Sequence, residues 1–274
     1  MGDTPIGWLS DLNAKYTPSS TQFDAARGHR ASIESRLDSD LGVREMFEIG
    51  SLRHGTGVWI YSDADYLVSL KGIRPESIWT MLEKVKSSLE RRFPSTTIST
   101  RRPAVVCKFS DGTVEVVPGY PATTGHWIAH PSGGWMLTHP KDHNAYVNGV
   151  NSRHSGAVKK LARELKVWKY KRNVPISSCY LEMRAAKYMD GQDTYSAVWD
   201  LHGALKHLQD VGLAAMNDPT GLGSRFTACS SDTNTADALS KLNTAVARAG
   251  RAKAHWVAGE SAESIDDLKL LFNQ

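Results

Sequence analysis

Cysteine is scarce in this sequence of 274 residues. Cys107, Cys179 and Cys229 lie far apart and form no Cys-x-x-Cys pair, so neither a disulfide framework nor a cysteine zinc site is expected. No stretch approaches the roughly 20 apolar residues that cross a membrane. Residues 1–11 lack the basic and apolar segments of a signal peptide. We therefore expect a cytoplasmic protein without a membrane partner.

A strong excess of one charge is also lacking. The chain has 33 Lys and Arg against 29 Asp and Glu, and its formal net charge is +4. This balance gives no strong sign of nucleic-acid binding, because proteins that bind a phosphate backbone usually carry a clear excess of basic residues. Hydrophobic residues make up 41% of the chain, which is enough for a core and excludes a disordered protein.

The hydrophobic pattern divides the chain near residue 140. Before it, helices are expected over residues 21–41, with Phe23, Ala26, Ile33 and Leu37 on one face, and from Pro75 to Pro94; strands are expected over 46–49, 64–70, 104–109 and 113–117. After it, helical stripes begin at Val158, Leu181, Leu201 and Leu239. The predicted class is α+β: a mixed sheet with flanking helices in residues 1–140 and a helical domain in residues 141–274.

Three acidic residues stand out in the predicted strands. Asp63 and Asp65 are two residues apart, so in an extended chain they project to the same side. Their charges repel, and a hard divalent cation between them relieves that repulsion. Glu115 lies among valines in the strand 113–117. If that strand neighbours the strand of Asp65, three carboxylates converge and can hold two metal ions for a displacement at phosphorus. Alternatively, Glu115 faces solvent on an edge strand, which the nearby Pro118 would favour.

Two further features suit phosphate binding. Gly50 and Ser51 can leave a backbone N–H and a hydroxyl free for phosphate oxygens. Lys159, Arg163 and Lys166 share one face of a predicted helix. These cations could neutralise a triphosphate, or they could form an ordinary solvated surface.

Taken together, these residues resemble a known superfamily. Gly50-Ser51, Gly55-Thr56, Asp63-x-Asp65 and the later Glu115 look like the polymerase β-type nucleotidyltransferases. The order and spacing of the downstream motifs, from about residue 16 to 256, are similar to the cGAS/DncV-like nucleotidyltransferases, bacterial relatives of cyclic GMP-AMP synthase and oligoadenylate synthase. These motifs are His139-Pro140, Leu165-Lys166-Val167-Trp168, Ser178-Cys179-Tyr180-Leu181-Glu182 and Asp218-Pro219.

The resemblance implies a polymerase β-type core followed by a helical domain that completes a nucleotide cleft. It implies that Asp63 and Asp65 bind two Mg²⁺ or Mn²⁺ ions, with Glu115 in place of the third carboxylate, which is usually Asp. The residues that the resemblance assigns to the donor triphosphate are Gly50, Ser51, Lys166 and Ser178. The residue after the family serine is often an aromatic that stacks on the donor base. Here it is Cys179, so stacking would come from Tyr180 or elsewhere.

In function, the resemblance implies a metal-dependent enzyme that joins nucleoside triphosphates, as donor and acceptor, into a cyclic di- or trinucleotide second messenger. It also implies a role in anti-phage defence and an effector protein that senses the product. One alternative is a transferase that adds a nucleotide to an RNA end or a protein. Another is a non-catalytic nucleotide-binding module, against which three converging acids argue.

Overall fold

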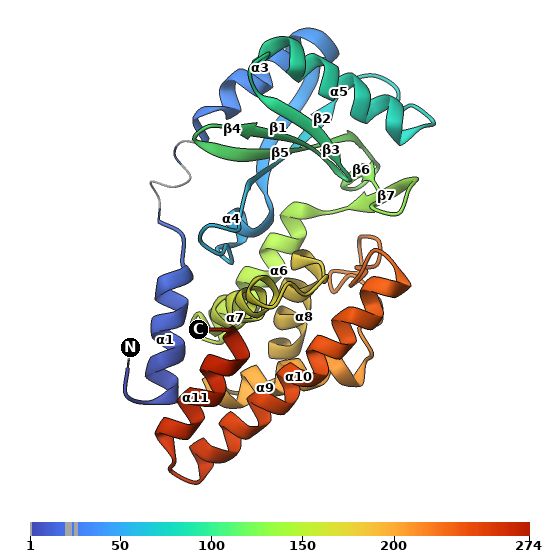
Figure 1. Cartoon of the computed structure of the whole chain (residues 1–274). Coiled ribbons are helices and arrows are strands. Elements are labelled where there is room, and N and C mark those ends of the chain that lie inside the picture. The colour runs from blue at the N-terminus through green and yellow to red at the C-terminus, as the bar shows by residue number, and fades with distance from the viewer. Residues whose placement is uncertain (1, 20–23, 25–26) are drawn as a thin grey trace.

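A computed structural model describes residues 2–19, 24 and 27–274. A mixed sheet lies between two helices on one side and a helical bundle on the other (Figure 1). The strands are β1 (Val43–Ile49), β2 (Ala64–Leu70), β3 (Thr97–Arg101), β4 (Ala104–Phe109), β5 (Gly112–Pro121), β6 (His126–Ala129) and β7 (Trp135–Thr138). The helices are α1 (Pro5–Tyr16), α3 (Arg30–Leu41), α4 (Gly50–His54), α5 (Ile78–Arg92), α6 (Pro140–Arg153), α7 (Ala157–Lys171), α8 (Ser178–Asp190), α9 (Ala197–Asp210), α10 (Asp232–Val257) and α11 (Ser261–Phe272).

The sheet places β5 in its interior. The strand order is β1-β2-β5-β4-β3, and β6 pairs with both β5 and β7. β2 and β5 run parallel, whereas β1 with β2 and β4 with β5 are antiparallel. The predicted α+β class is confirmed, and the predicted strand 64–70 is β2. The predicted hairpin is β4 and β5, although β5 continues to Pro121.

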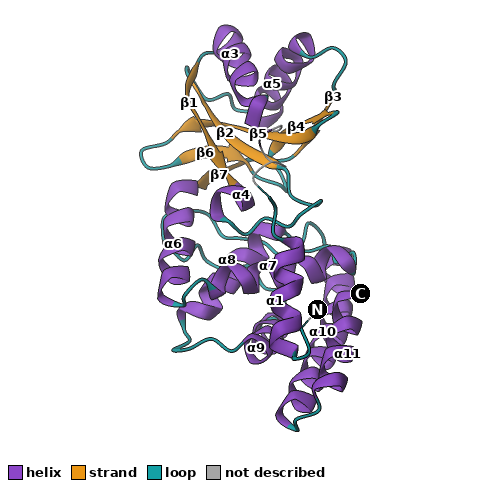
Figure 2. Ribbon diagram, turned by 90° about the vertical axis from the view of Figure 1, so that its left-hand side faces the viewer, coloured by secondary structure: helices purple, strands orange, loops and turns teal. Residues whose placement is uncertain are grey.

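Alternate residues of the central strands face two different surroundings. Tyr66 and Val68 on β2 belong to the core beneath α3 and α5, together with Ile33 and Leu82 from those helices. Leu67 points the other way, into a smaller apolar group. Figure 2 shows α3 and α5 together on one face of the sheet, with the helical bundle beyond the opposite face.

The predicted helices before residue 140 are present with shifted starts. α3 begins at Arg30 and covers the second half of the predicted helix 21–41. Phe23 and Ala26 lie outside the described residues. α5 begins at Ile78 rather than near Pro75, because the Ser77 hydroxyl accepts a hydrogen bond from the Trp79 N–H and caps the helix there.

Helix α1 was not predicted, and it packs with the helical half of the molecule. Trp8, Leu9 and Leu12 are buried in the same core as α7 and α11, and Asn13 Nδ2 donates to Glu164 Oε1 at 2.5 Å. The predicted division at residue 140 grouped these residues with the sheet, whereas their contacts lie with the helices. In the described part of the chain, no helix is long and apolar enough to span a membrane.

Candidate active site

The parallel pairing of β2 with β5 brings two predicted site residues side by side. Asp65 is the register partner of Glu115, and side chains at paired positions of neighbouring strands point to the same face. Asp63 lies just before β2 begins. Because β5 is an interior strand and the Glu115 side chain is 14% exposed, the alternative of a solvent-facing edge position is wrong.

Gly50 allows the backbone to pass directly against this acid pair. Ile49, the last residue of β1, pairs with Asp65, so the chain turns into α4 beside the Asp65 carboxylate. Gly50 has φ 69°, a left-handed conformation that favours glycine. A Cβ at this position would also lie 2.9 Å from Asp65 Cγ. Glycine is therefore required at residue 50 by both conformation and space.

The negative charges of Asp63 and Asp65 repel each other in this arrangement. Burial, together with the neighbouring charge of Asp63, raises the pKa of Asp65 to about 7. Burial also raises the pKa of Asp63, and the opposing effect of Arg101 is smaller. A cation placed between the two carboxylates would stabilise them.

Arg101 on β3 is the cation that the structure places among these acids, and the sequence reasoning missed it. Its guanidinium contacts Glu115 and lies 3.4 Å from Asp63 Oδ2, while its side chain is 66% exposed. The Glu115 Oε1 atom is buried, and the Arg101 guanidinium is the cation that contacts it. Among the described residues, no three His, Cys, Asp or Glu side chains lie close enough together to hold a metal ion as they stand. The carboxylates nevertheless fit a hard cation, because one exposed arginine reaches both Asp63 and Glu115.

Ser51 lies on α4, one residue after the Gly50 turn. Its hydroxyl donates to Ser62 Oγ at 3.2 Å, and Ser62 Oγ accepts the Val58 N–H at 2.8 Å. The Ser51 hydroxyl is therefore held on the loop that leads to Asp63.

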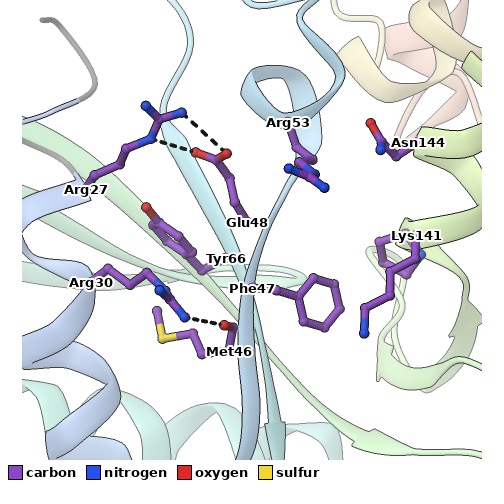
Figure 3. A pocket seen from close by; sticks show the side chains of 10 residues that line it. Arg27, Arg30, Met46, Phe47, Glu48, Arg53, Tyr66, Lys141 and Asn144 are labelled. Atoms are coloured by element: carbon purple, nitrogen blue, oxygen red, sulfur yellow. Dashed lines mark hydrogen bonds and ion pairs between the residues drawn. The ribbon is translucent and has the colours of Figure 1, made fainter. Parts of the chain in front are cut away.

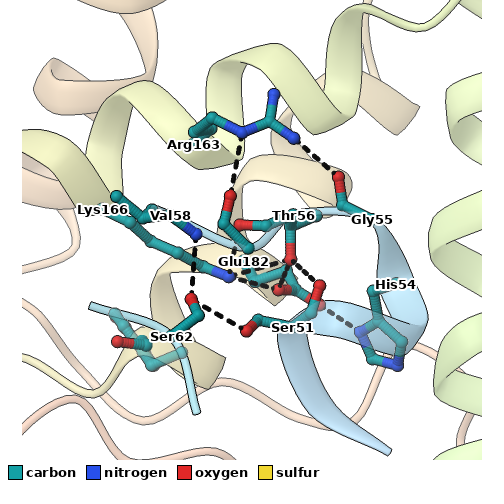
Figure 4. Close-up of polar contacts among 12 residues, drawn as sticks. Ser51, His54, Gly55, Thr56, Val58, Ser62, Arg163, Lys166 and Glu182 are labelled. Carbon is teal, nitrogen blue, oxygen red and sulfur yellow. Dashed lines mark hydrogen bonds and ion pairs between the residues drawn. The ribbon is translucent and has the colours of Figure 1, made fainter. Parts of the chain in front are cut away.

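Lys166 lies in a buried network instead of an open phosphate site (Figure 4). Its Nζ donates to Glu182 Oε2 at 2.6 Å, to Thr56 Oγ1 at 2.8 Å and to the Thr56 carbonyl at 3.2 Å. His54 and the Thr56 hydroxyl also contact the Glu182 carboxylate. Burial alone would raise the pKa of Glu182, but Lys166 and His54 hold it far below its usual range. All three ammonium protons have acceptors, so the predicted phosphate contact would require breaking this network.

The cation beside Ser178 is Lys169. Its Nζ donates to Ser178 Oγ at 2.7 Å, and the Tyr170 hydroxyl lies 3.1 Å from the same oxygen. Burial, with smaller effects from Lys166 and Arg101, lowers the pKa of Lys169 to about 8. Helical spacing also places Lys169 three residues after Lys166, and that signal could have identified it.

The aromatic residues near Ser178 differ from the expectation. Tyr180 is fully buried in the core of the helical half, so it is not placed to stack on a nucleotide base. Tyr61 and Tyr170 instead stack on each other with ring centroids 4.4 Å apart, and both are partly exposed. Cys179 is exposed.

Comparisons with known proteins identify the family and the fold. The model of the Second Messenger Oligonucleotide or Dinucleotide Synthetase domain matches residues 4–151, more than half of the chain. No curated protein matches the sequence. Among solved structures, Escherichia coli MS115-1 CdnC with ATP is 15% identical with a TM-score of 0.79, covering 100% of this chain and 99% of that one.

Two other solved structures show the same fold. Bradyrhizobium diazoefficiens CdnG in complex with GTP is 13% identical with a TM-score of 0.71, and the match covers 98% of this chain and 99% of that one. Escherichia coli DncV in its 3′-deoxy GTP bound form is 13% identical with a TM-score of 0.72, covering 96% and 93% of the two chains.

Proposed function

Because the chain belongs to the Second Messenger Oligonucleotide or Dinucleotide Synthetase family and is thus a nucleotidyltransferase, we propose that it joins nucleoside triphosphates into a cyclic di- or trinucleotide. Pyrophosphate would leave at each step. The observation that carries this proposal is the register of β2 and β5, which sets Asp65 beside Glu115. A common cation, Arg101, reaches both Glu115 and Asp63.

In this proposal Asp63, Asp65 and Glu115 hold two divalent ions, Mg²⁺ or Mn²⁺. The support lies in the chemistry of the donors: all are carboxylates, and burial with a like charge raises the pKa of Asp65 to about 7. When bound, the ions would polarise the α-phosphate, lower the pKa of the attacking ribose hydroxyl and stabilise the leaving pyrophosphate. Arg101 is exposed and free to leave the carboxylates when the ions bind.

The donor triphosphate is assigned to Gly50, Ser51, Lys169 and Ser178. Gly50 permits a close backbone approach, and Ser51 presents a hydroxyl from α4. Lys169 and Ser178 already share a hydrogen bond, so a phosphate oxygen can accept from both. We assign Lys166 to positioning, because it fixes the loop at Thr56 through the Glu182 network.

Substrates and partners are proposed from the structural neighbours. CdnC is solved with ATP and CdnG with GTP, which favours nucleoside triphosphates as donor and acceptor. CdnC is also solved in a complex with a HORMA protein, and by analogy we propose a protein partner for this chain. We propose that the product acts on an effector protein in anti-phage defence, in the cytoplasm.

The test is to incubate the purified chain with the four ribonucleoside triphosphates and Mg²⁺ or Mn²⁺ and to identify products by mass spectrometry. A cyclic product supports the proposal. Consumption of nucleotide only after addition of RNA or a protein acceptor would favour an end-adding transferase, and no turnover with either ion would favour a non-catalytic module.

Glu115 gives a matched pair of variants for the same assay. Glu115→Gln should form no product and Glu115→Asp should keep part of the activity, because only the second retains a carboxylate. Glu has one methylene more than the usual Asp, and Mn²⁺ tolerates a looser ligand arm than Mg²⁺ does. Activity with Mn²⁺ should therefore equal or exceed that with Mg²⁺. Full activity in Glu115→Gln would remove this residue from the ligand set.

A further inference from the structure

Three consecutive backbone carbonyls after α4 accept hydrogen bonds from cationic side chains of α7 (Figure 4). Arg163 Nη2 donates to the Gly55 carbonyl at 2.8 Å, and Arg163 Nε donates to the Gly57 carbonyl at 2.9 Å. Between them, the Thr56 carbonyl accepts from Lys166 at 3.2 Å. Arg163 and Lys166 are three residues apart and therefore share one face of the helix. This segment is thus held on α7 through all three of its carbonyl oxygens.

The nitrogens of the Arg163 guanidinium all meet acceptors of the protein. The residue is 7% exposed, and its Nη1 donates to Asn13 Oδ1 on α1 at 3.4 Å. Asn13 Nδ2 donates to Glu164 Oε1 and to the Leu9 carbonyl, which leaves the amide oxygen for a donor such as Arg163. A solvated surface position is therefore excluded for Arg163, and a phosphate contact would require breaking these hydrogen bonds.

The segment 55–57 is tied to a residue that we assign to the donor triphosphate. The Thr56 N–H donates to the Ser51 carbonyl at 2.9 Å. The Val58 N–H donates to Ser62 Oγ, which also accepts from the Ser51 hydroxyl. A displacement of the segment would therefore move the Ser51 hydroxyl, whereas the acids on β2 and β5 are placed by strand pairing.

Two other arginines lie near the segment in sequence or on the same helix, and each contacts a different place. Arg53 on α4 lines the cavity beside β1 (Figure 3). Arg172, the C-cap residue of α7, donates to the Leu271 carbonyl at 3.2 Å and to the Leu270 carbonyl, both in α11. Arg172 is therefore a matched control: a guanidinium at the end of α7 that binds two carbonyls of α11 rather than of the loop.

We propose that Arg163 is a positioning residue of the donor site, which fixes the segment 55–57 and through it the Ser51 hydroxyl, and does not itself bind phosphate. The part that concerns nucleotide rests on the proposed function, in which Ser51 contacts the donor triphosphate. A guanidinium suits this task, because its planar fork reaches two carbonyls at once and stays charged when buried. A lysine ammonium is a single point of charge and would reach one of the two.

Hydrogen–deuterium exchange of the full chain without nucleotide tests the positioning. In Arg163→Met, the peptide that covers residues 55–62 should exchange about fivefold faster or more, because the bonds to two of its carbonyls are lost. Peptides from β4 and β5 should exchange as in the original chain. Arg172→Met should leave residues 55–62 unchanged. If circular dichroism shows that Arg163→Met does not fold, Arg163→Lys replaces it and should exchange about twofold faster or more.

Kinetics test whether Arg163 acts through Ser51. In Arg163→Met, KM for the nucleoside triphosphate should rise about tenfold and kcat should fall by less than about threefold, because strand pairing places the acids. In a Ser51→Ala background, the same substitution should change KM by less than about twofold, since the hydroxyl that it positions is already absent. Arg172→Met should leave both parameters unchanged.

Two results would overturn the inference. The first is equal exchange of residues 55–62 in a folded Arg163 variant and in the original chain. The second is a KM that rises by the full factor in the Ser51→Ala background, since Arg163 would then contact the nucleotide directly. Because exchange is measured without nucleotide, a chain that forms no product would refute the proposed function and leave the exchange comparison to decide this inference.

Discussion

The carboxylate cluster of Asp63, Asp65 and Glu115 and the network around Lys166 contain the same kinds of charged groups in opposite electrostatic states. Asp63 and Asp65 repel each other, and an exposed Arg101 is their cation. Lys166 and Glu182 are almost completely buried, yet each meets hydrogen-bonding partners from more than one element. Both places were expected from the sequence to face nucleotide.

The comparison distinguishes carboxylates that lack a buried partner cation from buried charged groups whose hydrogen bonds stabilise the fold. A buried carboxylate with a raised pKa lowers the stability of the folded chain unless a cation is bound to it, and this is the state that we propose for Asp65 before metal binding. A buried ion pair with full hydrogen bonding is costly to break. The network joins α7 and α8 to the loop after α4, and it therefore ties the helical half to the sheet half.

The largest effect on this comparison is expected from Asp65→Asn. We expect product formation to fall by about three orders of magnitude, because a charged metal ligand is lost. The midpoint of thermal unfolding in EDTA should stay the same or rise, because repulsion with Asp63 is relieved. Mass spectrometry and calorimetry measure the two effects. Near-normal product formation would refute the assignment of Asp65.

Lys166→Ala should have the reverse pattern. Removing the cation leaves Glu182 charged and buried, so the free energy of unfolding should fall by about 3–5 kcal/mol. Lys160→Ala, an exposed lysine on the same helix, should change it by less than about 0.5 kcal/mol. Urea denaturation measures both. If Lys166→Ala is as stable as Lys160→Ala and only nucleotide affinity falls, Lys166 is a phosphate ligand after all.

The pH dependence of stability should distinguish the acid cluster further. The pKa of Asp65 is raised to about 7, above its unfolded value, so the unfolded chain loses this proton at lower pH than the folded chain does. In EDTA, the free energy of unfolding should therefore fall as the pH rises from about 4 to 7, because the folded chain holds the Asp65 proton more tightly than the unfolded chain does. Between pH 5 and pH 8, the free energy of unfolding of Asp65→Asn should therefore rise by about 2 kcal/mol relative to that of the original chain. Equal pH profiles in urea denaturation would contradict the raised pKa.

Lys169→Gln should give the smallest effect. We expect KM for the donor triphosphate to rise about tenfold while kcat changes less, because the lysine is assigned to the phosphates beside Ser178. The pKa of Lys169 is lowered to about 8, so KM of the original chain should also rise above pH 8 as this charge is lost. That rise should be absent in Lys169→Gln and present in Lys160→Gln. An unchanged KM in Lys169→Gln would exclude the contact.

Much of the sheet half could be predicted from local pattern. The apolar run at residues 64–70 is β2, and the paired valine-rich runs around Asp111 are β4 and β5. α1 could not be predicted in this way, because its burial depends on α7 and α11, which lie far along the chain. Short strands such as β3, and with it Arg101, carry too few residues for a periodic signal.

The sequence by itself determined the chemistry at each position: two acids two residues apart, a glycine before a serine, and a third acid within a valine run. These features depend on backbone geometry over a few residues, which sequence spacing specifies. Only the tertiary structure decided that β5 lies beside β2, that Arg101 reaches the acids, and that Lys169 rather than Lys166 meets Ser178. Strand pairing and helix packing join residues that are distant in the chain, and the burial that results sets which charges are satisfied and which remain for a ligand.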